Sequence, residues 1–152
     1  MPVLETSNFG AIAYEPESVI EFPRGLPGFE GRRRFLAVQT PNSVPLVFLQ
    51  SLEEPSLCFP TMPVLVLDSQ YRLQVAEEDL DTVGLPRDRQ PRIGEDVLCV
   101  AVLSFRETGA TANLLAPVVV NLKNQKAVQA IAPESDYSHQ HALFPRQAAA
   151  CS

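Results

Sequence analysis

The sequence predicts a mostly β protein: a compact antiparallel β-barrel-like or sandwich single domain with one short helix near residues 76–84. Prolines point to this class first, because 14 of them are spread along the 152 residues and an interior proline costs a helix ~3 kcal/mol. Short apolar stretches separated by turn residues roughly every 8–12 positions point the same way. Hydrophobic residues form 45% of the chain, which suffices for one buried core.

The first half of the chain reads as short strands between turns. Residues 8–10 suit a tight reversal between the first two strands. The segment 23–29 holds two prolines and two glycines, which predicts a shaped turn. Pro60 and Pro63 predict that the apolar stretch 57–67 is an edge strand, a bulge or two short pieces, because proline cannot donate to a sheet ladder. Strands are expected at 3–7, 11–14, 18–22, 33–40 and 46–52.

The second half contains the expected helix and the most apolar strand. Residues 71–75 alternate apolar and polar side chains, which predicts a half-buried strand. Acidic residues open the segment 76–83, where the helix dipole favours them, and Gly84 and Pro86 follow as stop signals. Strand 97–105 is expected at the centre of the sheet. Further strands are expected at 111–115, 118–122 and 127–132, and the domain is expected to span 1–144, followed by a flexible C-terminal tail at 145–152.

The charge and the apolar runs exclude several classes of function. Twelve basic against 18 acidic residues give a net charge of −6, which disfavours direct nucleic-acid binding and suits a basic protein partner. The N-terminus has no basic region followed by an apolar one, so no secretory signal is expected. The longest apolar runs, 97–103 and 114–120, are seven residues each, too short to cross a membrane. The predicted location is therefore cytoplasmic.

The sequence contains no recognisable catalytic or metal-binding pattern. Cys58 and Cys99 read as small core residues, and Cys151 falls in the expected tail. His139 and His141 are too few for a zinc site, which takes three or four protein ligands. No nucleophile elbow, phosphate loop or calcium loop is present. We therefore expect no enzyme activity, no cofactor and no small-molecule substrate, which leaves binding as the default class.

Four segments carry a further pattern in a fixed order and spacing. The first, residues 22–30, reads Phe-Pro-Arg-Gly-Leu-Pro-Gly-Phe-Glu, and the others lie at 48–59, 111–121 and 135–143. Together with residues 4–10, the pattern resembles the FliW flagellar assembly factors over about residues 2–143. Phe48 stands where that family often has Trp, and Ser138 and Gln140 stand where it typically has Pro and Arg.

The resemblance implies a switch between two protein partners. FliW-like proteins bind the RNA-binding translational repressor CsrA and also bind flagellin. When flagellin is exported, freed FliW captures CsrA and relieves the repression of flagellin translation. The resemblance thus implies a CsrA antagonist with a small β-barrel-like fold and no cofactor. The alternative is a flagellin-specific assembly chaperone without a translational role.

The four segments also supply the candidate contact residues. Leu49, Leu114 and the run 118–120 are expected to pack in the core. Asn113 and Asn121 fit two roles, partner contact or the capping of turns by side-chain hydrogen bonds, and Phe48 fits either the core or an aromatic anchor. The predicted partner-binding residues are Phe48, Gln50, Glu53, Glu54, Asn113 and Asn121.

Overall fold

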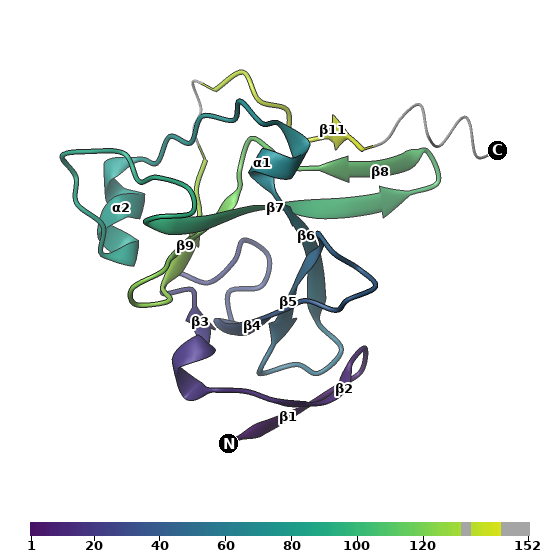
Figure 1. The fold of residues 1–152 in the computed structure, drawn as a ribbon. Helices are drawn as coiled ribbons and strands as arrows, with labels where there is room; N and C mark the ends of the chain where they lie inside the picture. The colour runs from purple at the N-terminus through teal and green to yellow at the C-terminus, as the bar shows by residue number, and fades with distance from the viewer. Residues whose placement is uncertain (132–134, 144–152) are drawn as a thin grey trace.

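Antiparallel strands form the framework of the molecule (Figure 1) in a computed structural model that describes residues 1–131 and 135–143. The main sheet has the order β10-β9-β7-β6-β5-β4-β3, β8 and β11 branch from β7, and β1 and β2 form a separate hairpin. The strands are β1 Val3–Thr6, β2 Gly10–Ala13, β3 Ile20–Glu21, β4 Arg34–Val38, β5 Val47–Ser51, β6 Cys58–Pro63, β7 Val97–Arg106, β8 Gly109–Ala112, β9 Val118–Asn121, β10 Ala127–Gln129 and β11 His141–Ala142.

The main sheet curls until its two ends meet. The Glu21 amide of β3 donates to the Gln125 carbonyl beside β10 at 2.9 Å, and a single bridge joins Glu21 to Lys126. No continuous ladder extends from this bridge through the described strands, so the curled sheet is not closed into a complete barrel. The prediction of an antiparallel, barrel-like β fold is confirmed in this partly closed form.

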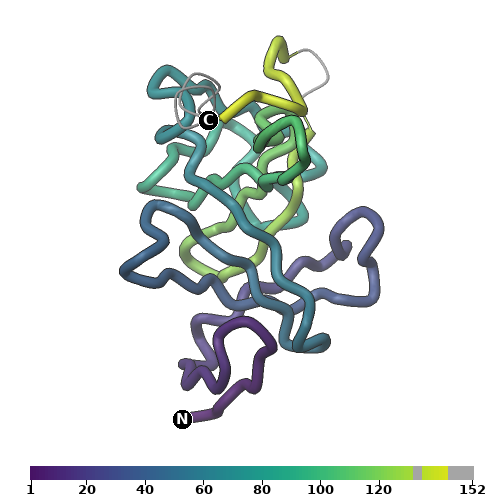
Figure 2. Tube along the Cα trace, turned by 90° about the vertical axis from the view of Figure 1, so that its right-hand side faces the viewer, coloured from purple at the N-terminus to yellow at the C-terminus, as the bar shows by residue number. Residues whose placement is uncertain are grey.

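Strand β7, predicted at the centre of the sheet, is an interior strand and pairs with β6, β8 and β9. Its alternating side chains separate two groups of buried residues. Cys99 and Ala101 belong to the first core cluster, which α2 (Glu77–Val83) and β8 also build, and Val100 belongs to the second, inside the curl of β3, β4 and β5. Figure 2 shows the N-terminal hairpin at one end of the molecule and the described C-terminal residues at the other.

The predicted helix is confirmed as α2. Glu77, Glu78 and Asp79 occupy its first turn, and Gly84 ends it in the left-handed conformation with φ +78°, which a glycine adopts without steric cost. Leu80 and Val83 are fully buried in the first core cluster.

The predicted strand at 71–75 is wrong, although its burial pattern is right. Tyr71 and Val75 are buried and Arg72 is exposed, but no strand of the described residues pairs with this segment. Side chains take the place of a ladder: Gln90 donates to the Val75 carbonyl at 3.1 Å and accepts from the Val75 amide at 2.7 Å. The hydroxyl of Tyr137 accepts from the Arg72 amide at 2.8 Å.

The stretch 57–67 is divided between a strand and a helix. Residues 58–61 of β6 pair with β5, and residues 61–63 pair with β7. Pro60 and Pro63 thus each have a paired strand on one side only, which a residue without an N–H tolerates. The edge-strand alternative is wrong, because β6 lies between two strands. Helix α1 (Val64–Leu67), the 3-10 turn η1 (Pro16–Ser18) and β11 were not predicted.

The turn at 23–29 is shaped by glycine, as predicted. Gly25 has φ +71°, and a Cβ there would lie 2.8 Å from the Glu30 Cα. The Phe29 amide donates to the Leu26 carbonyl at 2.8 Å.

No helix in the described residues is long and apolar enough to cross a membrane. The tail predicted at 145–152 and the domain boundary at 144 lie outside the described residues.

Candidate functional site

Gln50 lies on β5 but does not reach the surface. Its side chain is fully buried, and its amide nitrogen donates to the Ser51 and Pro55 carbonyls, both at 3.1 Å. These bonds fix the turn that follows β5. Gln50 is therefore an interior residue that ties β5 to the following turn at the Pro55 carbonyl, which also accepts from the Ser7 amide at 3.0 Å.

Glu53 and Glu54 form the turn after β5, and both are paired with arginines. The Ser51 hydroxyl accepts from both glutamate amides at 3.0 Å. Arg34 contacts the Glu53 carboxylate at 3.0 Å, and Arg32 contacts that of Glu54 at 2.8 Å. The two glutamate side chains keep 28% and 37% exposure. A partner could therefore reach both carboxylates, but their charge is partly neutralised in the free protein.

Phe48 is half-buried at the junction between β5 and the N-terminal hairpin. Its ring packs edge to face against that of Phe9, with centroids 5.3 Å apart, which is a favoured aromatic geometry. The Phe9 amide donates to the Thr6 hydroxyl at 2.9 Å, which holds the turn of the hairpin in place. Phe48 thus combines a packing role with a partly accessible edge.

Asn113 and Asn121 cap turns, the alternative that the sequence left open. The Asn113 side-chain oxygen accepts from the Ala116 amide at 3.0 Å. Asn121 is 3% exposed; its oxygen accepts from the Lys123 amide at 3.0 Å, and its nitrogen donates to the Val83 carbonyl at 2.8 Å. Asn121 therefore ties the end of α2 to β9 and is not a surface residue.

An arginine also anchors α2. Arg24 contacts the Asp79 carboxylate and the Glu78 carbonyl, each at 3.0 Å. Burial raises the pKa of Asp79, while the charge of Arg24 opposes that rise. The turn that carries Arg24 is thereby attached to the helix, so the first recognised segment has a structural function at this position.

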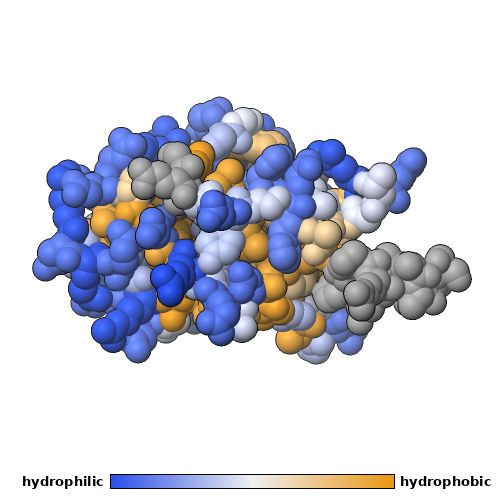
Figure 3. Space-filling view, turned by 90° about the horizontal axis from the view of Figure 1, so that it is seen from above, coloured by the Kyte–Doolittle hydropathy of each residue, from blue (hydrophilic) through white to orange (hydrophobic). Residues whose placement is uncertain are grey.

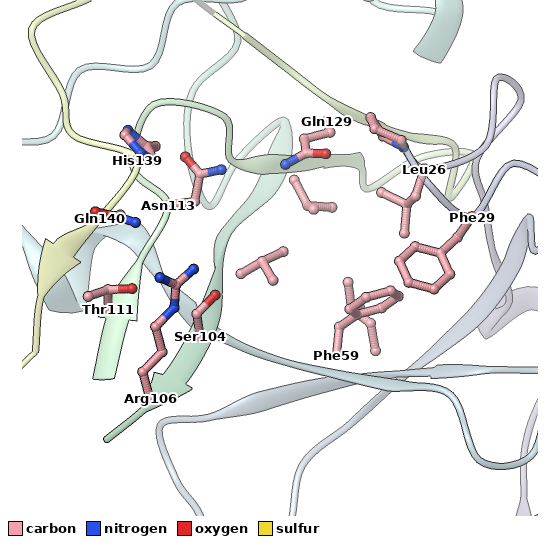
Figure 4. A pocket seen from close by; sticks show the side chains of 14 residues that line it. Leu26, Phe29, Phe59, Ser104, Arg106, Thr111, Asn113, Gln129, His139 and Gln140 are labelled. Carbon is pink, nitrogen blue, oxygen red and sulfur yellow. The ribbon is translucent and has the colours of Figure 1, made fainter. Parts of the chain in front are cut away.

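The six predicted residues do not form one site. Phe48, Glu53 and Glu54 belong to β5 and its turn, whereas Asn113 follows β8 and Asn121 ends β9. Asn113 instead lines a cavity with Ser104, Arg106 and other residues that the sequence analysis did not select (Figure 4). The signal for it was the change from apolar to polar side chains along the C-terminal half of β7.

The described residues offer no metal cluster and no reactive thiol. No three His, Cys, Asp or Glu side chains gather there. Cys99 is buried as predicted, and burial raises its pKa to about 12; Cys58 is half-buried, and its pKa is also raised by burial. A thiol in that state is a poor nucleophile at neutral pH. Cys151 lies outside the described residues.

The surface is mixed in character. Seen from above, hydrophilic side chains cover most of the molecule and hydrophobic ones show in patches between them (Figure 3). Large exposed hydrophobic side chains include Val44, Val66 and Phe105. They lie on a loop, on α1 and on β7 respectively, so they do not single out one interface.

Comparisons with known proteins agree on one family. The family model described as FliW protein matches residues 3–143. A flagellar assembly factor FliW of Syntrophomonas wolfei is 35% identical over 144 residues, covering 91% of this chain and 87% of that protein. One of Desulfitobacterium hafniense strain Y51 is 31% identical over 141 residues, covering 93% and 90%. A crystal structure of the flagellar assembly factor FliW matches with a TM-score of 0.82 and 25% identity, covering 96% of this chain and 99% of the other.

Proposed function

The chain belongs to the FliW family of flagellar assembly factors, and we propose on this premise that it binds the translational repressor CsrA and flagellin. By capturing CsrA when flagellin is scarce, it would couple flagellin translation to flagellum assembly. The observation that carries the proposal is the extent of the family match, which includes all four recognised segments within residues 3–143. Its site of action would be the cytoplasm, where translation takes place.

The net charge supports the choice of a basic partner. A protein that binds RNA presents positive charge, and a chain with a net charge of −6 attracts it over long range. After docking, the same charge would repel RNA phosphates near the captured repressor. RNA could then be lost without the RNA-binding surface being blocked directly.

The turn after β5 is the proposed contact for CsrA. Glu53 and Glu54 are reachable and follow β5, the strand that carries the partly accessible Phe48. Their arginine partners are themselves half exposed, with side-chain exposures of 43% for Arg32 and 56% for Arg34. Such exposed pairs contribute only ~0–1 kcal/mol each, so a basic partner can compete for the carboxylates.

A pull-down with purified CsrA and flagellin tests the proposal. We expect the chain to retain CsrA alone and to release it when flagellin is added. The double variant Glu53→Lys and Glu54→Lys should weaken CsrA retention, and the loss should diminish as salt is raised. The matched control is Glu77→Lys with Glu78→Lys on α2, which makes the same change in net charge at a different surface.

The outcomes separate the two functions and the two explanations of the charge effect. Retention of flagellin without any retention of CsrA would establish the assembly chaperone in place of the regulator. Equal losses in both double variants would show that net charge acts at long range and that the turn after β5 is not the contact. Affinity unchanged at low and high salt would reject the electrostatic argument altogether.

A further inference from the structure

A cavity of about 290 Å³ opens at the edge of the second core cluster. Its volume is just below the range for ligand pockets, ~300–1,000 Å³, so it suits a short stretch of chain. Leu26, Phe29 and Phe59 form an apolar group at one side of the close-up in Figure 4. The two phenylalanine rings meet edge to face with centroids 5.1 Å apart, and Phe29 remains 39% exposed.

The opposite side of the cavity carries hydrogen-bond donors. Ser104 and Thr111 face each other across the β7–β8 pair, and Figure 4 shows them with Arg106, Asn113 and His139 away from the apolar group. The side chains of Ser104, Arg106 and Thr111 form no hydrogen bond within the described residues. Asn113 uses its oxygen for the Ala116 amide, which leaves its NH₂ group available.

The charge of the cavity differs from that of the protein as a whole. Among the residues that the structure describes, no acidic one lines the cavity, although the chain has a net charge of −6. Most arginines of the described residues form an ion pair or a hydrogen bond through their side chains. Within the same residues, the side chains of Arg106 and Arg72 form neither. A carboxylate placed beside Arg106 would thus meet a cation without an existing partner.

We propose that this cavity binds the C-terminal end of an extended peptide, with the terminal carboxylate at Arg106 and an apolar side chain packed against Phe29 and Phe59. Val102 and Arg106 both line the cavity from β7, and four residues of strand span ~13 Å. The apolar side chain should therefore lie about three or four residues before the terminus.

Two features favour a peptide terminus over other carboxylates. The free NH₂ group of Asn113 and the oxygen of Gln129, whose nitrogen donates to the Ala116 carbonyl at 3.0 Å, can pair with peptide groups, which a fatty acid lacks. The donor-rich end is bordered by segment 138–142, which is tied to the β8 side through the Leu114 amide and the β8–β11 pair. A chain that ends there avoids crossing this segment.

Titration of the isotope-labelled chain with short synthetic peptides, followed by NMR chemical shifts, tests the proposal. The probe is acetyl-Gly-Leu-Ala-Ser-Ala with a free carboxylate, compared with its C-terminal amide and with octanoate. We expect shifts at the cavity residues and binding at least about tenfold weaker for the amide, because a hydrogen bond to a charged group is lost. Arg106→Gln should cause the same loss, and the exposed, unpaired Arg72 provides the control variant Arg72→Gln.

Each result decides the proposal. Equal affinity for the acid and the amide, or equal affinity of the Arg106→Gln and Arg72→Gln variants, would overturn it, as would the absence of shifts at millimolar peptide. Octanoate binding as tightly as the peptide would assign the cavity to acyl chains instead. Because the titration uses neither CsrA nor flagellin, its failure leaves the proposed function standing, and the pull-down can fail without affecting this result.

Discussion

Asn121 provides the sharpest separation between a structural role and a binding role. Its side chain makes two hydrogen bonds, to the Val83 carbonyl and from the Lys123 amide, and is buried between α2 and β9. Asn121→Ala removes both. Since each such bond contributes ~0.5–1.5 kcal/mol net, we expect the free energy of unfolding to fall by about 1–3 kcal/mol. For a chain of this size, each kcal/mol lowers the melting temperature by ~2–4 °C.

Asn124 supplies the matched control on the same acceptor. Its side-chain nitrogen also donates to the Val83 carbonyl, at 3.0 Å, but the residue is exposed. In urea unfolding, Asn124→Ala should therefore lower the free energy of unfolding by less than Asn121→Ala does. The dependence of that free energy on urea concentration should be unchanged. In the double variant the Val83 carbonyl loses both side-chain donors, so the loss should exceed the sum of the single losses.

Stability and partner retention, measured together on Asn121→Ala, decide whether this reasoning holds. If Asn121→Ala unfolds at the wild-type urea concentration and yet retains less CsrA or flagellin in a pull-down, Asn121 acts through a partner. If instead stability falls and retention of both partners at a temperature where the variant is folded is unchanged, the structural assignment holds.

Three further perturbations test separate parts of the structure. Gly25→Ala should destabilise the chain by more than Gly28→Ala in urea unfolding, since both glycines have positive φ but only the first Cβ meets backbone, 2.8 Å from the Glu30 Cα; equal costs would contradict the close approach. Cys99 should resist alkylation at pH 8 until urea unfolds the chain, because burial raises its pKa to about 12; mass spectrometry of the labelled peptide would reveal any native-state reaction. Hydrogen bonds from the Arg92 amide and the Arg89 side chain lower the pKa of Asp96 in the folded chain. The ionised Asp96 therefore stabilises the fold above its pKa in the unfolded chain, and this stabilisation is lost as the pH falls through its pKa in the folded chain. Asp96→Asn should make the free energy of unfolding depend less on pH in the acid range, and an unchanged pH dependence would count against this role.

The elements predicted correctly are those whose signals are local. Helix α2 has acidic residues at its start and Gly84 at its end, and both act within a few residues of chain. The interior position of β7 followed from its apolar length, because only an interior strand buries both faces. These features depend little on what the rest of the chain does.

The errors arose where distant residues decide the outcome. Gln90 satisfies the backbone of Val75, so a segment with the burial of a strand needs no neighbouring strand. Gln50 and Asn121 are buried, and each donates to a backbone carbonyl that the fold brings close to it. A polar residue in a recognised segment can therefore stabilise the fold as easily as it can contact a partner, and the sequence does not distinguish the two.

The position of β7 between the two core clusters bears on how the molecule unfolds. Cys99 and Ala101 pack into one cluster and Val100 into the other, so neither cluster can open without releasing a strand that the other also holds. The two should therefore melt in one cooperative transition rather than in sequence. The amide hydrogens in the buried part of β7 should then exchange with solvent only through unfolding of the whole domain.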